Sequence, residues 1–194
     1  MIRLAQVEDL SAMLNIYAPY ILNTTATFEY TVPTFPEFHA RFSEITRQFP
    51  WLVWEEDGKV LGYAYASAPF TRAAYQWCAE PSIYLAPEIQ GKGIGRKLYH
   101  VLEAILKQQG YRVLYAIITQ ENLGSLAFHQ RLGYTLTAQF PNCGWKFQRW
   151  LGVTWLEKRL DFVDSPSCAP SPIGDVVDFS QKLDDILAKL SISK

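Results

Sequence analysis

Cysteine and histidine are scarce in this chain of 194 residues, which has three of each. The cysteines, Cys78, Cys143 and Cys168, are an odd number with no close pair, and no two histidines stand at ligand spacing. Disulfide frameworks and zinc sites both need paired spacings. We therefore predict neither a disulfide scaffold nor a metal site.

Long apolar runs and a surplus of one charge are also missing. No stretch approaches the roughly 18 apolar residues of a membrane span, and no basic start followed by an apolar run marks a signal peptide. Eighteen basic residues against nineteen acidic ones give a net charge of -1, which argues against a polyanion as the main partner. We predict a cytoplasmic protein that uses neither a membrane nor a nucleic acid.

Apolar and aromatic residues are plentiful, at 49% and 14% of the chain. That is enough for the core of one domain. Aromatic side chains line pockets as well as filling cores, and both interpretations stay open here.

Apolar spacing, caps and breakers predict four helices, at residues 7–22, 34–49, 93–109 and 122–132. In the second, Thr34 and Glu37 form a capping box and Pro50 marks the end. Short apolar segments predict seven strands, at residues 1–5, 51–55, 60–68, 77–85, 113–118, 134–138 and 150–160. Asp57-Gly58 predicts a hairpin between the second and third strands.

The composition changes near residue 160. We predict one domain over residues 1–160, a linker containing Pro and Ser over 161–177, and an amphipathic tail helix over 178–194. The tail carries an apolar stripe of Leu183, Ile186, Leu187 and Leu190. Such a stripe docks on its own domain, on a dimer mate or on another partner.

The stretch that points to chemistry is the loop over residues 90–96, where Gly91, Gly93 and Gly95 lie between a strand and a helix. Backbone N–H groups at a helix start are unpaired and the helix dipole adds positive potential there, so such a loop can bind phosphate. Lys92 and Arg96 can add charge. The spacing fits neither the dinucleotide fingerprint nor the P-loop, and a plain tight turn is the alternative.

Gln90-x-x-Gly93-x-Gly95 resembles the Q/R-x-x-G-x-G/A motif of the GCN5-related N-acetyltransferases (GNAT). A second block, which starts at Asn122-x-x-Ser125 and ends at Gly133-Tyr134, is similar to the motif that holds the pantetheine arm of coenzyme A in that superfamily. The resemblance covers about residues 1–160. It implies an α/β GNAT fold, with a central mixed, mostly antiparallel twisted sheet flanked by helices, and acetyl-CoA as the co-substrate.

Within the superfamily, the chain looks most like the phosphinothricin and methionine sulfoximine acetyltransferases. Similar segments lie at residues 27–29, 75–80 and 129–134, and residues 146–152 (K-F-Q-R-W-L-G) are similar to that subfamily's K-F-G-R-W-L-D. The chain departs from the pattern at Gln148 and Gly152. The resemblance also implies a homodimer.

The resemblance implies a role for individual residues. Glu80 would be the general base, and His129 would protonate the thiolate of coenzyme A. The co-substrate would be held by Ile83, Tyr84, Leu85, Gln90, Gly91, Lys92, Gly93, Ile94, Gly95, Arg96, Asn122 and Ser125, with the amide near Leu85 polarising the thioester carbonyl. The acceptor would meet Phe28, Arg72, Tyr75 and Trp77.

Each role has a structural alternative. Glu80 can be a solvent-facing strand residue, His129 a packed histidine, Asn122 a plain helix cap and Arg72 a solvated loop residue. Phe28, Tyr75 and Trp77 can be core side chains, as can Tyr30.

The implied function is transfer of an acetyl group to the α-amine of a small amino acid or analogue. Alternatives are acetylation of a polyamine or of a protein N-terminus, and a non-catalytic acyl-CoA sensor.

Overall fold

The computed structural model describes residues 1–161 and 168–176, which form seven strands and four α-helices around one sheet. The strands are β1 (Ile2–Leu4), β2 (Trp51–Glu56), β3 (Lys59–Ser67), β4 (Cys78–Leu85), β5 (Val113–Thr119), β6 (Thr135–Lys146) and β7 (Arg149–Arg159). The helices are α1 (Leu10–Asn23), α2 (Phe35–Ile45), α3 (Ile94–Gln109) and α4 (Leu123–Arg131). Short 3-10 turns lie at Val7–Asp9, Ala73–Tyr75, Pro87–Ile89 and Ile173–Asp175.

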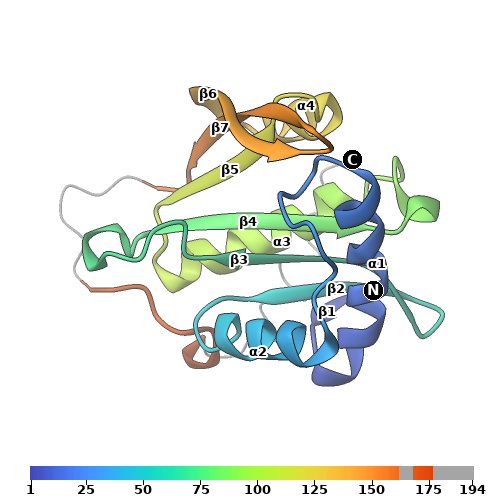
Figure 1. Ribbon diagram of the computed structural model, residues 1–194. Coiled ribbons are helices and arrows are strands. Elements are labelled where there is room, and N and C mark those ends of the chain that lie inside the picture. Colours follow the sequence, from blue (N-terminus) through green and yellow to red (C-terminus); the bar gives the residue numbers. More distant parts are fainter. Residues whose placement is uncertain (162–167, 177–194) are drawn as a thin grey trace.

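The strand order in the sheet is β1-β2-β3-β4-β5-β7-β6. All neighbouring strands are antiparallel except β4 and β5, which are parallel. Figure 1 shows β5, β6 and β7 turning away from the plane of β1 to β4. The predicted mixed, mostly antiparallel sheet flanked by helices is confirmed.

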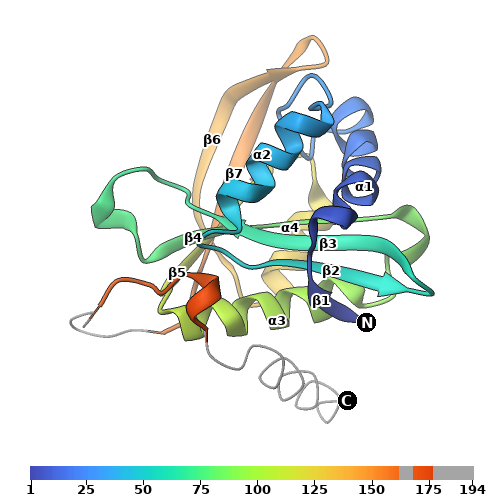
Figure 2. The ribbon, with the colours of Figure 1, turned by 90° about the horizontal axis from the view of Figure 1, so that it is seen from below.

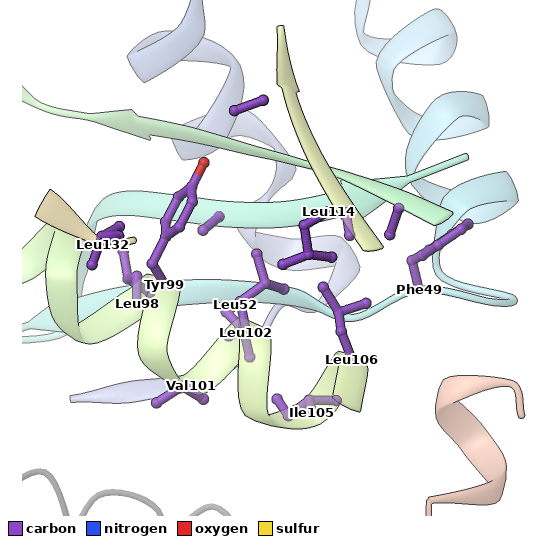
Figure 3. Packing of buried hydrophobic residues seen from close by; sticks show 14 of the residues in the cluster. Phe49, Leu52, Leu98, Tyr99, Val101, Leu102, Ile105, Leu106, Leu114 and Leu132 are labelled. Carbon is purple, nitrogen blue, oxygen red and sulfur yellow. The ribbon is translucent and has the colours of Figure 1, made fainter. Parts of the chain in front are cut away.

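Helices cover both faces of the sheet. Because successive strand side chains point to opposite faces, Leu52 of β2 packs in the cluster of α3, whereas Trp51 and Val53 pack with α1 and α2. Figure 2 shows α3 on one side of the sheet and α1 and α2 on the other. In Figure 3, Leu98, Leu102 and Leu106 of α3 lie against the strands that carry Leu52 and Leu114.

The capping box of α2 is present, with the Thr34 side chain accepting from the Glu37 amide and the Glu37 side chain accepting from the Thr34 amide. The predicted end of this helix at residue 49 was wrong, because α2 ends at Ile45. Residues 46–48 continue as tighter turns, in which the Arg47 amide donates to Glu44 and the Gln48 amide to Ile45. Pro50 therefore bounds a turn that follows the helix, and not the helix itself.

The sixth strand is longer than its predicted range of 134–138, because it continues to Lys146. Its register against β7 jumps between Phe140 and Gly144, so residues 141–143 form a bulge opposite Gly152. A proline and an asparagine at positive φ can sit in a bulge without ending the strand. Pro141 and Asn142 (φ 54°) lie in such a bulge here. Because these residue types are common in turns, the sequence did not predict the second half of the strand.

The two-residue turn between β6 and β7 is strained. Phe147 and Gln148 have φ of 52° and 58°, and Lys146 pairs with Arg149 across them. Left-handed backbone costs a residue with a side chain about 1 kcal/mol relative to glycine.

We expect Gln148→Gly to raise the free energy of unfolding by about 1 kcal/mol in urea titration, because glycine relieves this strain. Gln139→Gly, the same exchange at an exposed extended position of β6, should lower it. Equal effects at both positions would contradict the strain at Gln148.

Part of the segment predicted as a linker contacts the domain. The side chain of Gln109 donates to Ser171 O at 2.8 Å, and the Ile173 amide donates to Gln48 O at 3.1 Å. Pro170 is buried beside Gly110. Residues 168–176 thus dock across the end of α3. The predicted tail helix lies outside the described residues.

Candidate active site

A cavity of about 690 Å³ opens where β4 and β5 separate. The two strands pair only at Cys78–Val113 and Ala79–Leu114. Beyond these pairs, β4 keeps β3 on one side and has no strand on the other. The Ala86 amide donates to Leu61 on the β3 side, so the alternating amides of Ile83 and Leu85 point toward the cavity.

The glycine-rich loop borders the same cavity. Gly91 and Gly93 have φ of 74° and 78°, and Gly93 caps α3. The first α-helical backbone bond runs from the Lys97 amide to Gly93 O, so the amides of residues 94–96 precede the helical ladder. They lie at the positive end of the helix dipole, as phosphate binding requires.

The predicted co-substrate residues divide into two groups. Eight of them line the cavity, namely Ile83, Tyr84, Leu85, Gln90, Gly91, Gly95, Asn122 and Ser125. Four do not line it, namely Lys92, Gly93, Ile94 and Arg96. Ile94 is buried in the core, and Arg96 Nε donates to His100 Nε2 at 3.1 Å, so Arg96 extends along α3.

Asn122 is an N-cap, as the structural alternative predicted. Its Oδ1 accepts from the Ser125 amide at 3.1 Å at the start of α4. Because Asn122 also lines the cavity, its capping bond leaves the amide nitrogen Nδ2 for another partner.

Tyr20 of α1 lies within the helix predicted at residues 7–22 and is not among the predicted site residues, yet its hydroxyl lies at the edge of β4. It donates to Leu85 O at 2.6 Å and accepts from the Leu85 amide at 3.2 Å. It also accepts from Gln90 Nε2 at 3.1 Å. Tyr20 therefore links α1, β4 and the glycine-rich loop at the predicted carbonyl-polarising amide.

Glu80 lies inside the cavity, on β4 opposite Ser67. Burial raises the pKa of its carboxyl from 4.5 to about 7, because the surroundings disfavour the charged form. A carboxyl with such a pKa exchanges a proton readily at neutral pH.

His129 is buried and fixed in one tautomer. Its Nδ1 lies 2.8 Å from Ser125 O, and a carbonyl only accepts, so Nδ1 carries the proton. Nε2 therefore accepts from the Tyr99 hydroxyl at 2.8 Å. Burial lowers the pKa of His129 to about 4, so the ring is neutral at physiological pH.

The predicted acceptor residues are spread over two places. Phe28 lines the cavity, whereas Arg72, Tyr75 and Trp77 do not. These three lie at the other end of β4, on the loop that carries the 3-10 turn Ala73–Tyr75 and projects beyond the sheet (Figure 1). There Tyr75 packs on Phe70, and Trp77 Nε1 donates to Cys168 O at 3.1 Å.

Three further residues of the cavity wall, Glu29, Arg41 and Tyr65, are not among the site residues predicted from the sequence. Arg41 of α2 is the one Lys or Arg among the described lining residues, and its Nη1 lies 2.8 Å from Glu29 Oε1. Tyr65 of β3 is half-buried beside them, and burial of its hydroxyl raises its pKa to about 12. Glu29 stands in the segment 27–29 that carried the resemblance. Arg41 and Tyr65 had no sequence signal that distinguished them from packed residues.

Comparison with known proteins now gives the family. Residues 2–155 match the family described as Acetyltransferase (GNAT) domain. This chain belongs to the GNAT acetyltransferase family.

Its relatives in this GNAT family have specific names. The chain is 35% identical to a phosphinothricin N-acetyltransferase of Alcaligenes faecalis over 166 residues, 84% of each chain. It is 37% identical to an L-methionine sulfoximine/L-methionine sulfone acetyltransferase of Salmonella typhimurium, over 82% of this chain and 94% of that one. A solved phosphinothricin acetyltransferase of Sinorhizobium meliloti in complex with AcCoA is similar, with a TM-score of 0.80 and 37% identity over 88% of this chain and 92% of that one.

Two further features of this GNAT chain concern membranes and metals. Within residues 1–161 and 168–176, no helix has the length and apolar character needed to cross a membrane. In the same part of the chain, no three His, Cys, Asp or Glu side chains gather where they could hold a metal ion.

Proposed function

We propose that this GNAT acetyltransferase moves the acetyl group of acetyl-CoA to the α-amine of a small amino acid or analogue, of the phosphinothricin, methionine sulfoximine or methionine sulfone type. The names of the relatives support this class of acceptor. The observation that carries the proposal is Glu80, a carboxyl with a pKa near neutrality inside a cavity that the glycine-rich loop borders.

The residues present fit acetyl-CoA, which supplies an activated thioester when bound. The free amides at the start of α3 suit its diphosphate. The cavity-facing edge of β4, which has no neighbouring strand at Ile83, suits the amide groups of its pantetheine arm, because an extended chain can add to a strand edge. The Leu85 amide on the same edge is held by the Tyr20 hydroxyl. Asn122 and Ser125 stand at the start of α4 on the cavity wall.

Glu80 acts as the base. Its carboxylate takes a proton from the acceptor ammonium, directly or through a water molecule, and so frees the nitrogen lone pair. That nitrogen forms a bond to the thioester carbonyl carbon while the carbon–sulfur bond breaks, and the sulfur leaves with the electron pair. Amides of the β4 edge stabilise the negative charge that develops on the carbonyl oxygen.

The leaving sulfur needs a proton. His129 is neutral and its one ring proton is held by Ser125 O. The proton that can leave this pair without breaking that bond is the one on the Tyr99 hydroxyl, which also lines the cavity. We therefore place Tyr99, oriented by His129, on the proton path: its hydroxyl gives a proton to the leaving sulfur and regains one from the amine nitrogen, which loses its second proton as the amide forms.

The predicted acceptor residues include Arg72, Tyr75 and Trp77. Their position limits how they could contact an acceptor. They lie outside the cavity of their own chain, so they can meet an acceptor only in the cavity of a second copy. The homodimer that the resemblance implies meets this condition.

The proposal is tested by acetyl-CoA turnover, measured as thiol release, against a panel of amines. The panel contains phosphinothricin, methionine sulfoximine, methionine sulfone, ordinary amino acids, spermidine and a short peptide. We expect turnover with the first three acceptors. Turnover confined to spermidine or the peptide would replace the acceptor class, and acetyl-CoA binding without any turnover would indicate a sensor.

A further inference from the structure

Lys146, the last residue of β6, is buried although it is a lysine, with 3% of its surface exposed. Its Nζ donates to Thr24 O at 2.9 Å and to Thr27 O at 2.7 Å. Burial lowers the pKa of the ammonium, and the nearby carboxylate of Glu29 opposes that shift. A side chain that is usually solvated is thus used to bind two backbone carbonyls of one loop.

That loop forms part of the cavity wall. It follows the end of α1 at Asn23, and its residues Ala26, Thr27, Phe28 and Glu29 all line the cavity. The segment between α1 and α2 has no helix or strand of its own, so its shape depends on contacts with other elements.

Two further contacts join the same loop to the end of β6. The Tyr30 hydroxyl donates to Trp145 O. The ring of Phe28 lies against Gly144 so closely that a Cβ at that position would overlap the ring. Gly144, Trp145 and Lys146 thus hold the loop at successive points. All three residues pair with β7, so the hairpin of β6 and β7 supports the loop.

We propose that Lys146 is a positioning residue for the acceptor: it fixes residues 24–29 in the shape that receives the amine, and so sets the affinity for the acceptor and not for acetyl-CoA. This inference rests on the proposed function. The glycine-rich loop and the β4 edge, which would hold acetyl-CoA, make none of the contacts of Lys146.

The charge and the length of the side chain are both required. An apolar residue of similar length would leave the carbonyls of Thr24 and Thr27 without a donor in a buried place, which favours a rearranged loop. Arginine keeps the charge and the donors but carries a larger planar head, so it should restore the function in part.

The test compares Lys146→Met, Lys146→Arg and wild type for the KM of methionine sulfone and the dissociation constant of acetyl-CoA measured by calorimetry. We expect Lys146→Met to raise the acceptor KM about tenfold or more while acetyl-CoA binding changes less than about twofold, with intermediate values for Lys146→Arg. Lys107→Met, at an exposed lysine of α3, is the matched control and should change neither.

Gly144→Ala tests the same loop by a second route, because the added methyl displaces Phe28 without removing a charge. It should show the same split between acceptor and acetyl-CoA, and it carries the test if Lys146→Met does not fold. An unchanged acceptor KM in a folded variant, or equal losses for both substrates, would overturn the inference. A wild type without turnover on any amine would instead overturn the proposed function, and this inference with it.

Discussion

Glu80→Gln is expected to lower kcat by about 10²-fold or more at neutral pH, because glutamine cannot accept the ammonium proton. The effect should be seen as loss of thiol release with the best acceptor of the panel. Acetyl-CoA binding should remain, since the amides at the start of α3 are untouched. Glu44→Gln, at an exposed position of α2, is the matched control.

The pH dependence of the same reaction follows from the pKa of Glu80, which burial raises to about 7. The base form is scarce below that pH and predominates above it. The kcat of the wild type should therefore rise as pH increases through about 7, and this limb should vanish in Glu80→Gln. A variant that keeps both the rate and the limb would exclude Glu80 as the base.

Stability should change in the opposite direction to activity. The folded-state pKa of Glu80 is raised above its ordinary value of 4.5, so its contribution to stability is fully present below pH 4.5 and is lost as pH rises through about 7. Glutamine does not ionise. At pH 8 the variant should thus be more stable than wild type by about 3 kcal/mol, as judged by urea unfolding, because a pKa difference of one corresponds to about 1.4 kcal/mol.

We expect Arg72→Ala to lower the turnover of carboxylate-bearing acceptors, and a mixture of Glu80→Gln and Arg72→Ala to recover activity. Arg72 lies outside the cavity of its own chain, so in the proposed homodimer its predicted contact with the acceptor is made in the cavity of the second copy, where an arginine suits the carboxylate of an amino acid. In a mixed dimer one cavity has its own Glu80 and the Arg72 of the second copy. Random 1:1 mixing makes half of the dimers mixed, with one of two sites intact, so about a quarter of wild-type turnover should return.

The control for this experiment mixes Glu80→Gln with His129→Gln. Both residues belong to the same cavity of one chain, so no mixed dimer has an intact site and no activity should return. Recovery in this control, or none with Arg72→Ala after the subunits have exchanged, would contradict an acceptor site shared between two copies.

Local sequence patterns were sufficient for most of the fold. The capping box at Thr34 and the hairpin at Asp57-Gly58 act through neighbouring residues, and both are present in the structure. The bulge in β6 was missed because Pro141 and Asn142 have the same composition as a turn. Only the continued pairing with β7 tells the two apart.

Fewer residues of the candidate active site could be predicted from local sequence patterns. Glu80, His129 and the glycine-rich loop came from short motifs, whereas Tyr20 and Arg41 come from helices and look like ordinary packed residues. Their place in the cavity depends on how α1 and α2 cross β4, which is a property of the tertiary structure. The tautomer of His129 likewise depends on a residue outside its motif: Ser125 lies in the same block, but the second partner, Tyr99, belongs to α3.

The separation of β4 from β5 has a consequence for local unfolding of the native protein. The strands β1 to β4 and the strands β5 to β7 form two ladders that share only the pairs Cys78–Val113 and Ala79–Leu114. Cooperative opening units follow such boundaries in native proteins. The two ladders should therefore exchange their amide hydrogens as two separate units, with free energies of opening that become equal only when a ligand bridges both walls of the cavity.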